Sequence, residues 1–257
     1  MATGSFSSPL LRDLFPTGAV GQLWTDSAEV RAMLIVLGAL AKVQGAQGAI
    51  PEDSAAFIHR SSLEVQIDPA GLSAQTAEDH DPVPALIAAF QRAMEAPEHA
   101  CHVLHATPAQ HIADTALMLR LRQTLAALEE RAQSLNPAVA AYVKGLPVLC
   151  DTALVVAAPA PVRAALAEAL KLADPGDDWS EDRGPIGQIA AWLATLTHLA
   201  GADEAGHPVL TALSTQMNAL QAMLAAPAAS PLIERMALPQ IALTAACAVE
   251  TAKGAAQ

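Results

Sequence analysis

Residues 25–48 read TDSAEVRAMLIVLGALAKVQGAQG and carry the clearest structural signal in this chain. Asp26 is placed to cap a helix, and Glu29, three residues later, can reach back to the free amides of the first turn. Apolar side chains then recur at helical spacing, at Val30, Met33, Leu34, Leu37 and Ala41. The glycines at the end of the run are typical of a helix terminus. We therefore predict a buried helix here.

The rest of the chain repeats this helical pattern. Further helices are predicted from Pro51, over 71–78, 84–94, 112–135, 137–144, 161–172, 187–200 and 208–225, and from 231 to 253. Pro239 lies inside the last of these and is expected to kink or break it. Residues 146–158 fit a buried strand or a helix, and we favour helix or irregular chain because no partner strand is evident. With 53% hydrophobic residues and only 3% aromatics, the chain is predicted to be all-α.

Charge and cysteine usage exclude several classes of partner. The chain has 14 basic and 26 acidic side chains, a net charge of −12, so phosphate backbones and anionic lipid would repel it. We therefore expect neither nucleic acid nor membrane as a partner. The three cysteines are far apart and odd in number, as in a reducing compartment. Because no secretory signal is evident and the longest apolar run is 32–41, a cytoplasmic location is expected.

The densest cluster of potential metal ligands lies between residues 98 and 111. It holds Cys101 and four of the eight histidines, namely His99, His102, His105 and His111. On a helix, the first three imidazoles would lie near one face, where they could bind a metal ion. A metal site usually draws ligands from more than one segment, however, so we favour the alternative in which each histidine packs or hydrogen-bonds separately. No metal is expected.

The other chemical motifs are weak. Asp79, His80 and Asp81 could form an acid–base cluster, because a carboxylate raises the pKa of a neighbouring imidazole. The same residues suit a turn before Pro82 and Pro84, which we favour. No serine stands in a G-x-S-x-G context and no glycine-rich phosphate loop occurs, so neither a serine nucleophile nor a cofactor is expected.

Five stretches resemble the fumarase/aspartase superfamily in the right order, and most closely its 3-carboxy-cis,cis-muconate cycloisomerase branch: 10–15 together with 24–46, then 77–86, 99–122, 179–190 and 234–240. The longest, HACHVLHATPAQHIADTALMLRLR, is similar to H-A-x-x-V-H-x-G-A-T-S-Q-D-x-x-D-T-x-L-x-L-R-L. The resemblance implies a long-helix bundle of the fumarase/aspartase type. It also implies a small N-terminal helical region over 1–108 and a shortened central and C-terminal bundle over 109–257.

Candidate site residues lie where the long helix begins, and the motif there is only partly kept. With the two patterns aligned, the Thr-Ser pair of the family falls on Pro108 and Ala109, and Gln110 is retained. A shift of one residue brings His105 and Thr107 near the histidine and threonine places of the motif. The resemblance therefore implies His105 and Gln110 as catalytic residues and Thr107 as a substrate-binding residue.

Two further motifs supply the remaining candidates. The stretch 179–190, WSEDRGPIGQIA, is similar to W-H-x-Q-R-D-x-I-x-E-F-A and keeps the arginine as Arg183. The family's G-S-S-x-M-P-x-K-x-N-P loop carries a catalytic serine and a substrate-binding lysine, and it corresponds here to 201–210, GADEAGHPVL. His207 stands near the tail of that motif, whereas the serines and the lysine are replaced. Arg183 and His207 are thus the expected substrate-binding residues.

These departures leave three functions open. Enzymes of this superfamily act on polycarboxylates through an anionic intermediate, which needs preorganised hydrogen-bond donors and cations. We favour a divergent relative that is not catalytic and serves assembly with, or regulation of, a related enzyme. The second alternative is an active cycloisomerase or lyase of aromatic-acid (protocatechuate) catabolism with a rebuilt site, and the third is a binding module that retains a carboxylate pocket. A homo-oligomer, dimer or tetramer, joined through 112–135, 208–225 and 231–253 is also expected.

Overall fold

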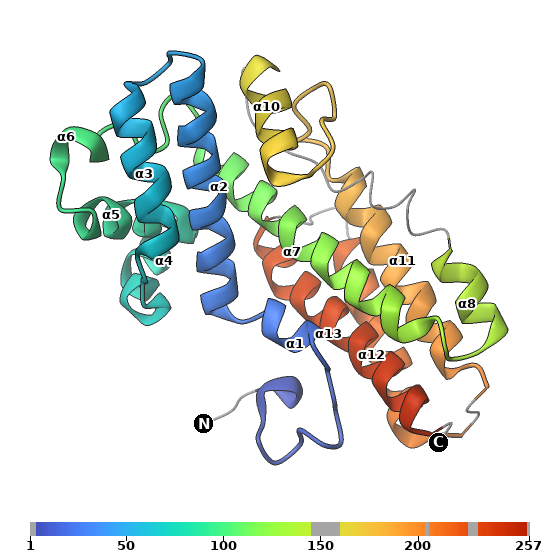
Figure 1. Ribbon diagram of the computed structural model, residues 1–257. Helices are drawn as coiled ribbons and strands as arrows, with labels where there is room; N and C mark the ends of the chain where they lie inside the picture. The colour runs from blue at the N-terminus through green and yellow to red at the C-terminus, as the bar shows by residue number, and fades with distance from the viewer. Residues whose placement is uncertain (1–3, 145–159, 204–205, 226–230, 256–257) are drawn as a thin grey trace. The chain divides into compact units, whose positions relative to one another are not determined.

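The structure, a computed structural model, describes residues 4–144, 160–203, 206–225 and 231–255. Within these ranges every regular element is a helix, which confirms the predicted all-α fold class (Figure 1). The ambiguous segment 146–158 lies outside the described residues. The α-helices are α1 (Val20–Leu23), α2 (Asp26–Ala46), α3 (Glu52–Glu64), α4 (Ser73–Asp79), α5 (Pro82–Ala93), α6 (Pro97–Ala100), α7 (Ala109–Ala132), α8 (Pro137–Val143), α10 (Ala160–Leu170), α11 (Gly184–Gly201), α12 (Pro208–Leu224) and α13 (Pro231–Ala255).

The helices form two compact units, each assembled from separate stretches of the chain. The first unit contains residues 1–24, 122–152 and 183–257, and the second contains residues 25–121 and 153–182. Helix α7 contributes its N-terminal part to the second unit and its C-terminal part to the first. The division implied by the resemblance, into 1–108 and 109–257, cuts the chain only once and stays a prediction.

The core of the second unit is built on α2, which packs along α3. Buried apolar side chains such as Leu34 of α2, Ile58 of α3 and Phe90 of α5 belong to one cluster. The two helices approach closely at Gly38, because a Cβ atom there would overlap the hydroxyl of Ser62. The helical periodicity of 25–48 therefore predicts the central element of this unit correctly.

Helix α2 begins close to the predicted position, but its cap is Thr25 rather than Asp26. Thr25 has an extended backbone, with φ −82° and ψ 155°, and its hydroxyl accepts a hydrogen bond from the amide of Ala28 at 3.2 Å. Asp26 is already helical, and its charge lies at the positive end of the helix dipole. The capping prediction is wrong by one residue, because the cap is the last residue before the helical backbone.

Asp79 is the last residue of α4, and His80 and Asp81 form the turn between α4 and α5, which agrees with the turn interpretation. His80 has a left-handed backbone with φ 56° and ends α4. Asp81 caps α5, and its Oδ1 accepts a hydrogen bond from the amide of Val83 at 3.0 Å. The Asp81 carboxylate therefore serves helix formation in this turn.

In the first unit, α11 and α12 pack against α13. Residues Ala245, Cys247 and Val249 in α13 are completely buried. The helix runs through Pro239, so the break that was one expectation there does not occur. Of the described helices, α13 alone is long and apolar enough to span a membrane, but 61% of its apolar window is buried inside the protein, as in the core helix of a soluble protein.

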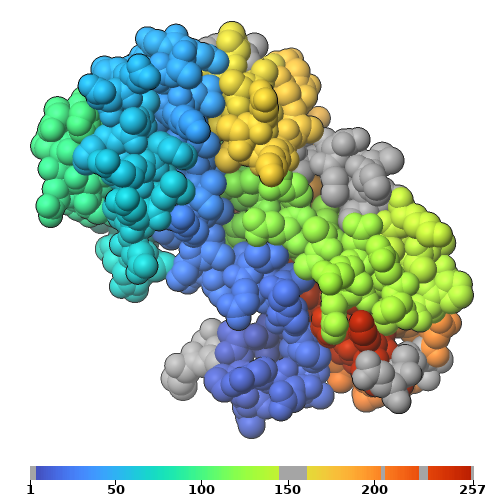
Figure 2. Space-filling view, viewed as in Figure 1, coloured from blue at the N-terminus to red at the C-terminus, as the bar shows by residue number. Residues whose placement is uncertain are grey.

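The N-terminal segment, residues 4–19, contributes nothing to this core. None of its residues is buried, and Leu10 is 90% exposed. The segment folds back on itself through an edge-to-face contact between the rings of Phe6 and Phe15, whose centroids lie 6.2 Å apart. It is the dark blue lobe in Figure 2. The superfamily-like stretch 10–15 therefore lies on the surface of the first unit.

Candidate functional site

Three of the predicted site residues lie together in the second unit, at the start of α7. His105 has an exposed side chain, while its backbone carbonyl accepts hydrogen bonds from Gln44 Nε2 at 2.7 Å and from Thr107 Oγ1 at 3.1 Å. Gln110 donates from Nε2 to Asp114 Oδ2 at 3.0 Å, one helical turn along α7. The bond from Gln44 fixes the loop to α2, whereas the other two are local, and one of them uses the hydroxyl proton of the buried Thr107.

The backbone around His105 is strained. Leu104 and Ala106, on either side of it, adopt left-handed φ values of 62° and 48°. Such conformations cost about 1–3 kcal/mol in non-glycine residues and persist where the surroundings enforce them. Gln44, a buried polar side chain on α2, holds the loop through the carbonyl of His105. Sequence reasoning missed Gln44, although its position continues the helical spacing of Leu37 and Ala41, and a polar residue in that series is a signal that could have found it.

A second polar contact in this unit joins His111 to Asp178. His111 is buried in the first turn of α7, and its Nε2 lies 3.3 Å from Asp178 Oδ2. The pKa of Asp178 is lowered, chiefly because its carboxylate accepts a hydrogen bond from the amide of Ser180 and also because His111 is near. The Nδ1 atom of His111 is buried and has no hydrogen-bond partner among the described residues. The pair anchors the chain that precedes Trp179.

The acidic stretch before Trp179 is also pinned to α10. Arg163 is buried and donates from Nε to Asp174 Oδ1 at 2.7 Å and from Nη2 to the carbonyl of Gly176 at 2.5 Å. The hydrogen bond from Arg163 is the main reason why the pKa of Asp174 is lowered. Gly176 has φ 79°, which a glycine adopts without strain. This arginine is therefore committed to holding a turn.

The clustered histidines have separate surroundings. Nδ1 of His99 lies 3.0 Å from the hydroxyl of Ser54, and its ring contacts that of Phe57 with centroids 4.6 Å apart. His111 contacts Asp178, as described above. Among the described residues, no group of three or more histidine, cysteine, aspartate or glutamate side chains is arranged to hold a metal ion.

The other two predicted site residues belong to the first unit. Arg183, just before α11, donates from Nε to Glu234 Oε1 at 2.9 Å and from Nη2 to Glu234 Oε2 at 2.5 Å. Glu234 is 8% exposed and lies in the first turn of α13. The ion pair thus joins two of the superfamily-like stretches, 179–190 and 234–240. The guanidinium charge is compensated inside the protein.

His207 immediately precedes α12, at the end of the loop where the superfamily carries its serine and lysine. The Nδ1 atom of His207 is buried and has no hydrogen-bond partner among the described residues, while its carbonyl accepts a bond from the hydroxyl of Thr211 at 3.1 Å. A cavity of about 280 Å³ lies between α11 and α12, and hydroxyl, amide and imidazole groups of His198, Thr211, Ser214, Thr215 and Asn218 line it. No charged side chain is among its lining residues.

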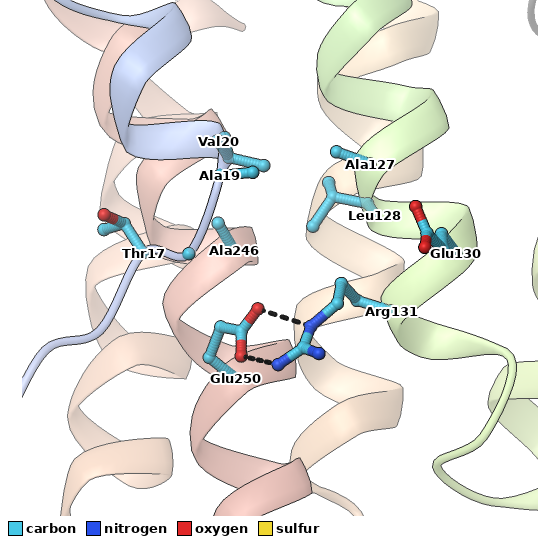
Figure 3. A pocket seen from close by; sticks show the side chains of 10 residues that line it. Thr17, Ala19, Val20, Ala127, Leu128, Glu130, Arg131, Ala246 and Glu250 are labelled. Carbon is cyan, nitrogen blue, oxygen red and sulfur yellow. Dashed lines mark hydrogen bonds and ion pairs between the residues drawn. The ribbon is translucent and has the colours of Figure 1, made fainter.

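Another cavity, of about 340 Å³, lies between the N-terminal segment, α7 and α13 (Figure 3). Arg131 of α7 and Glu250 of α13 meet there through two hydrogen bonds, the one from Nε to Oε1 being 2.7 Å long. The hydrogen bond to Glu250 raises the pKa of Arg131. Gly18 has φ 53°, and a Cβ added to it would lie 2.5 Å from Glu250 Oε1. Sequence reasoning missed this site, whose single arginine is already paired.

Comparison with known proteins gives one curated relative. No protein-family profile matches the chain. The chain is 31% identical over 113 residues to N-acetyl-S-(2-succino)cysteine lyase of Enterococcus italicus, a match that covers 44% of this chain and 24% of that protein. The chain thus spans about a quarter of the length of the curated relative that it matches.

Solved structures match over nearly the whole chain. The 3-carboxy-cis,cis-muconate lactonizing enzyme of Pseudomonas putida aligns with a TM-score of 0.84 and 22% identity, over 95% of this chain and 75% of that one. The β-carboxy-cis,cis-muconate cycloisomerase of Acinetobacter calcoaceticus aligns at 0.79 and 18%, over 95% and 76%. A fumarate lyase of Mesorhizobium aligns at 0.75 and 18%, over 91% and 73%. These matches show that the chain has the all-α fold of these muconate cycloisomerases and of this fumarate lyase, and the resemblance noted in the sequence agrees with that fold.

Proposed function

We propose that this chain is a 3-carboxy-cis,cis-muconate cycloisomerase-like protein of the fumarase/aspartase superfamily that has lost catalysis. The order of the five superfamily-like stretches and the fold of the solved neighbours support the relationship. The altered site residues support the loss. Its role is then assembly with, or regulation of, a related enzyme, and the resemblance suggests a cytoplasmic protein of aromatic-acid catabolism.

The observation that carries this proposal is that the lysine and serine of the loop are replaced and that the motif arginine is already paired with a carboxylate. A polycarboxylate reacting through an anionic intermediate needs cations and preorganised donors around the developing charge. The loop at 201–210 has no lysine and no serine, and the cavity beside it is lined by uncharged groups. Arg183, the motif arginine, is held by Glu234. Binding a substrate carboxylate there would first require breaking a partly buried ion pair.

A lactonisation assay on 3-carboxy-cis,cis-muconate tests the proposal. We expect no turnover above the rate in buffer when the substrate absorbance is followed at micromolar protein. A muconate cycloisomerase from another organism, assayed in parallel, controls for substrate quality, and circular dichroism controls for folding. Turnover near that of the control enzyme would overturn the loss of catalysis while leaving the fold relationship intact.

The second candidate is an active lyase or cycloisomerase whose site is rebuilt from His105, Thr107, Gln110, Arg183 and His207. The specific observation in its favour is the 31% identity over 113 residues to a lyase named for N-acetyl-S-(2-succino)cysteine, a polycarboxylate. Release of fumarate from that compound is the matching assay. If it occurs, His105→Asn should abolish it, whereas His102→Asn, in the same loop, should leave it unchanged.

The third candidate is a module that binds a polycarboxylate without chemistry. It is favoured only if 3-carboxy-cis,cis-muconate raises the Tm of the protein in the absence of turnover, because a ligand of the native state stabilises that state. Arg183→Gln should then remove the Tm increase. The net charge of −12 supports the absence of nucleic acid and of membrane surfaces from the partners in all three cases.

A further inference from the structure

The cavity of about 280 Å³ in the first unit has a wall that can form hydrogen bonds but carries no formal charge. Four polar residues of α12 line it, Thr211, Ser214, Thr215 and Asn218, and they share one face of the helix because they stand at positions i, i+3, i+4 and i+7. His198 of α11 lines it as well. Among the described residues of the lining there is no aspartate, glutamate, lysine or arginine.

The two threonines of this wall have already used their hydroxyl protons. Thr211 Oγ1 donates to the carbonyl of His207 at 3.1 Å, and Thr215 Oγ1 donates to the carbonyl of Thr211 at 2.9 Å. A hydroxyl group has one donor proton and two acceptor lone pairs. Toward the cavity, both threonines can therefore only accept hydrogen bonds, and a ligand group beside them has to donate.

The other three polar side chains can both donate and accept. Ser214 has a hydroxyl, Asn218 has a carboxamide with two donor protons and an acceptor oxygen, and a neutral His198 imidazole has one nitrogen of each kind. His198 and Asn218 are exposed and Ser214 is half-buried, so a ligand in the cavity can reach their polar groups. The wall thus offers donors and acceptors side by side.

Three classes of polar ligand fit such a wall differently. A carboxylate only accepts hydrogen bonds, so its lone pairs would face those of Thr211 and Thr215. An ammonium group only donates, and on losing water it needs a counter-charge, which none of the described lining residues supplies. A hydroxyl group donates and accepts at once. Several hydroxyl groups on one uncharged molecule therefore match the whole set of partners.

We propose that this cavity binds an uncharged cyclic polyol of about the size of a monosaccharide. Thr211 and Thr215 are one helical turn apart, a spacing of about 5–6 Å that hydroxyl groups on opposite sides of a six-membered ring can bridge. Leu210, which also lines the cavity, offers an apolar contact to the C–H groups of the ring. The volume is close to the lower end of the range for ligand pockets, about 300 Å³, as a small ligand requires. This inference adds a ligand to the proposed function and does not depend on the loss of catalysis.

Saturation-transfer NMR on the full chain tests the ligand class with three ring compounds. The probe is myo-inositol, an uncharged cyclic polyol, which should bind at millimolar concentration. Quinate, a hydroxylated ring with a carboxylate, and trans-4-aminocyclohexanol, a ring with an ammonium group, should bind about tenfold more weakly or not at all, because each leaves polar groups of the wall unmatched. Absence of myo-inositol binding, or equal binding of either charged compound, would overturn the proposal.

Two threonine variants locate the binding site. Thr215→Val removes the acceptor oxygen but keeps the branched shape of the side chain, and the dissociation constant of myo-inositol should rise about fivefold or more. Thr76→Val is the matched control: Thr76 Oγ1 also donates to the carbonyl four residues earlier, that of Leu72 at 2.9 Å, but it lies on α4 in the second unit. The control should bind as the wild type does. Unchanged binding in Thr215→Val, or an equal loss in both variants, would overturn the assignment to this cavity and leave the loss of catalysis, which is tested by turnover, untouched.

Discussion

Two arginine–glutamate pairs in the first unit have the same bidentate chemistry but different surroundings. In Arg183–Glu234 the two side chains are 27% and 11% exposed, and both lie in stretches that resemble the superfamily. In Arg131–Glu250 they are 45% and 15% exposed, and neither lies in such a stretch. The first pair joins the chain before α11 to α13, whereas the second borders the cavity beside the N-terminal segment.

The comparison teaches why a motif arginine can survive when the catalytic loop does not. Arg183 holds the buried carboxylate of Glu234, and an unpaired carboxylate at that position would be costly. Among the described residues of the loop at 201–210, the hydrogen bonds involve the backbone: the carbonyl of His207 accepts from the amide and the hydroxyl of Thr211, and the amide of Ala202 donates to the carbonyl of Leu199. A retained motif residue therefore supports a shared fold more directly than it supports a shared reaction.

The largest expected effect is that of breaking the more buried pair. Glu234→Gln removes the charge that compensates Arg183 and should lower the free energy of unfolding by about 2–3 kcal/mol. Urea unfolding monitored by circular dichroism measures it. Glu181→Gln, at an exposed position nearby, should change stability by less than about 0.5 kcal/mol. Equal effects of the two variants would contradict the structural role of the pair.

The next effect concerns Gly18, beside the Arg131–Glu250 pair. Comparing it with Gly48 separates the cost of backbone strain from the cost of crowding. Gly18→Ala must adopt φ 53° and also brings a Cβ against Glu250, so we expect a loss of about 2 kcal/mol. Gly48→Ala has φ 74° with no atom within 4 Å of the new Cβ and should lose about 1 kcal/mol. Thermal and urea unfolding give both values. If Gly18→Ala lowers the free energy of unfolding no more than Gly48→Ala does, the Glu250 carboxylate moves away from the new Cβ and is not held in place.

A smaller effect is expected from the exposed pair itself. Glu250→Gln should lower the free energy of unfolding by about 0.5–1 kcal/mol, because solvent screens a pair whose arginine is nearly half exposed. The loss should shrink further in about 1 M salt, where the screening length is about 3 Å. The loss in Glu234→Gln should change less with salt. If the losses of stability in the two variants depended on salt in the same way, the claim that solvent screens the two pairs differently would be contradicted.

The smallest effect is a pH dependence from Asp174 in the second unit. Its pKa is lowered from 3.8 by the hydrogen bond from Arg163, so the folded state binds this proton less readily than the unfolded state. The resulting stability is present above the unfolded pKa and is lost as the pH falls through the folded value. Asp174→Asn should therefore be less stable than wild type near neutral pH and approach it in acid. A difference that grows in acid would contradict the shift.

The positions of the helices could be predicted because the signals for them are local. The period of apolar residues in 25–48 and the prolines that begin α5, α8 and α12 depend on neighbours within a few residues. The one-residue error at Thr25 arises because the cap is defined by backbone angles that composition does not specify. Boundaries are the part of a helix that local patterns determine least.

The site could be predicted only in part. His105, Thr107 and Gln110 fall in one place because they are close in sequence, but Gln44, which holds their loop, is 61 residues from His105. Arg183 was found from its motif, whereas its partner Glu234 lies 51 residues away. Pairings at such separations depend on how helices pack, and a single sequence carries no local signal for them.

Helix content, acidity and the missing lysine and serine of the loop follow from the residues alone, because they are matters of composition and short-range order. Packing between distant segments decided which arginines pair with a carboxylate, which histidines are buried and which helix faces stay exposed. Arg163 and Arg183 look equally available in the sequence, yet each meets a carboxylate in the folded chain. The physical reason is that burial of a charge requires a partner, and the fold chooses that partner from far along the chain.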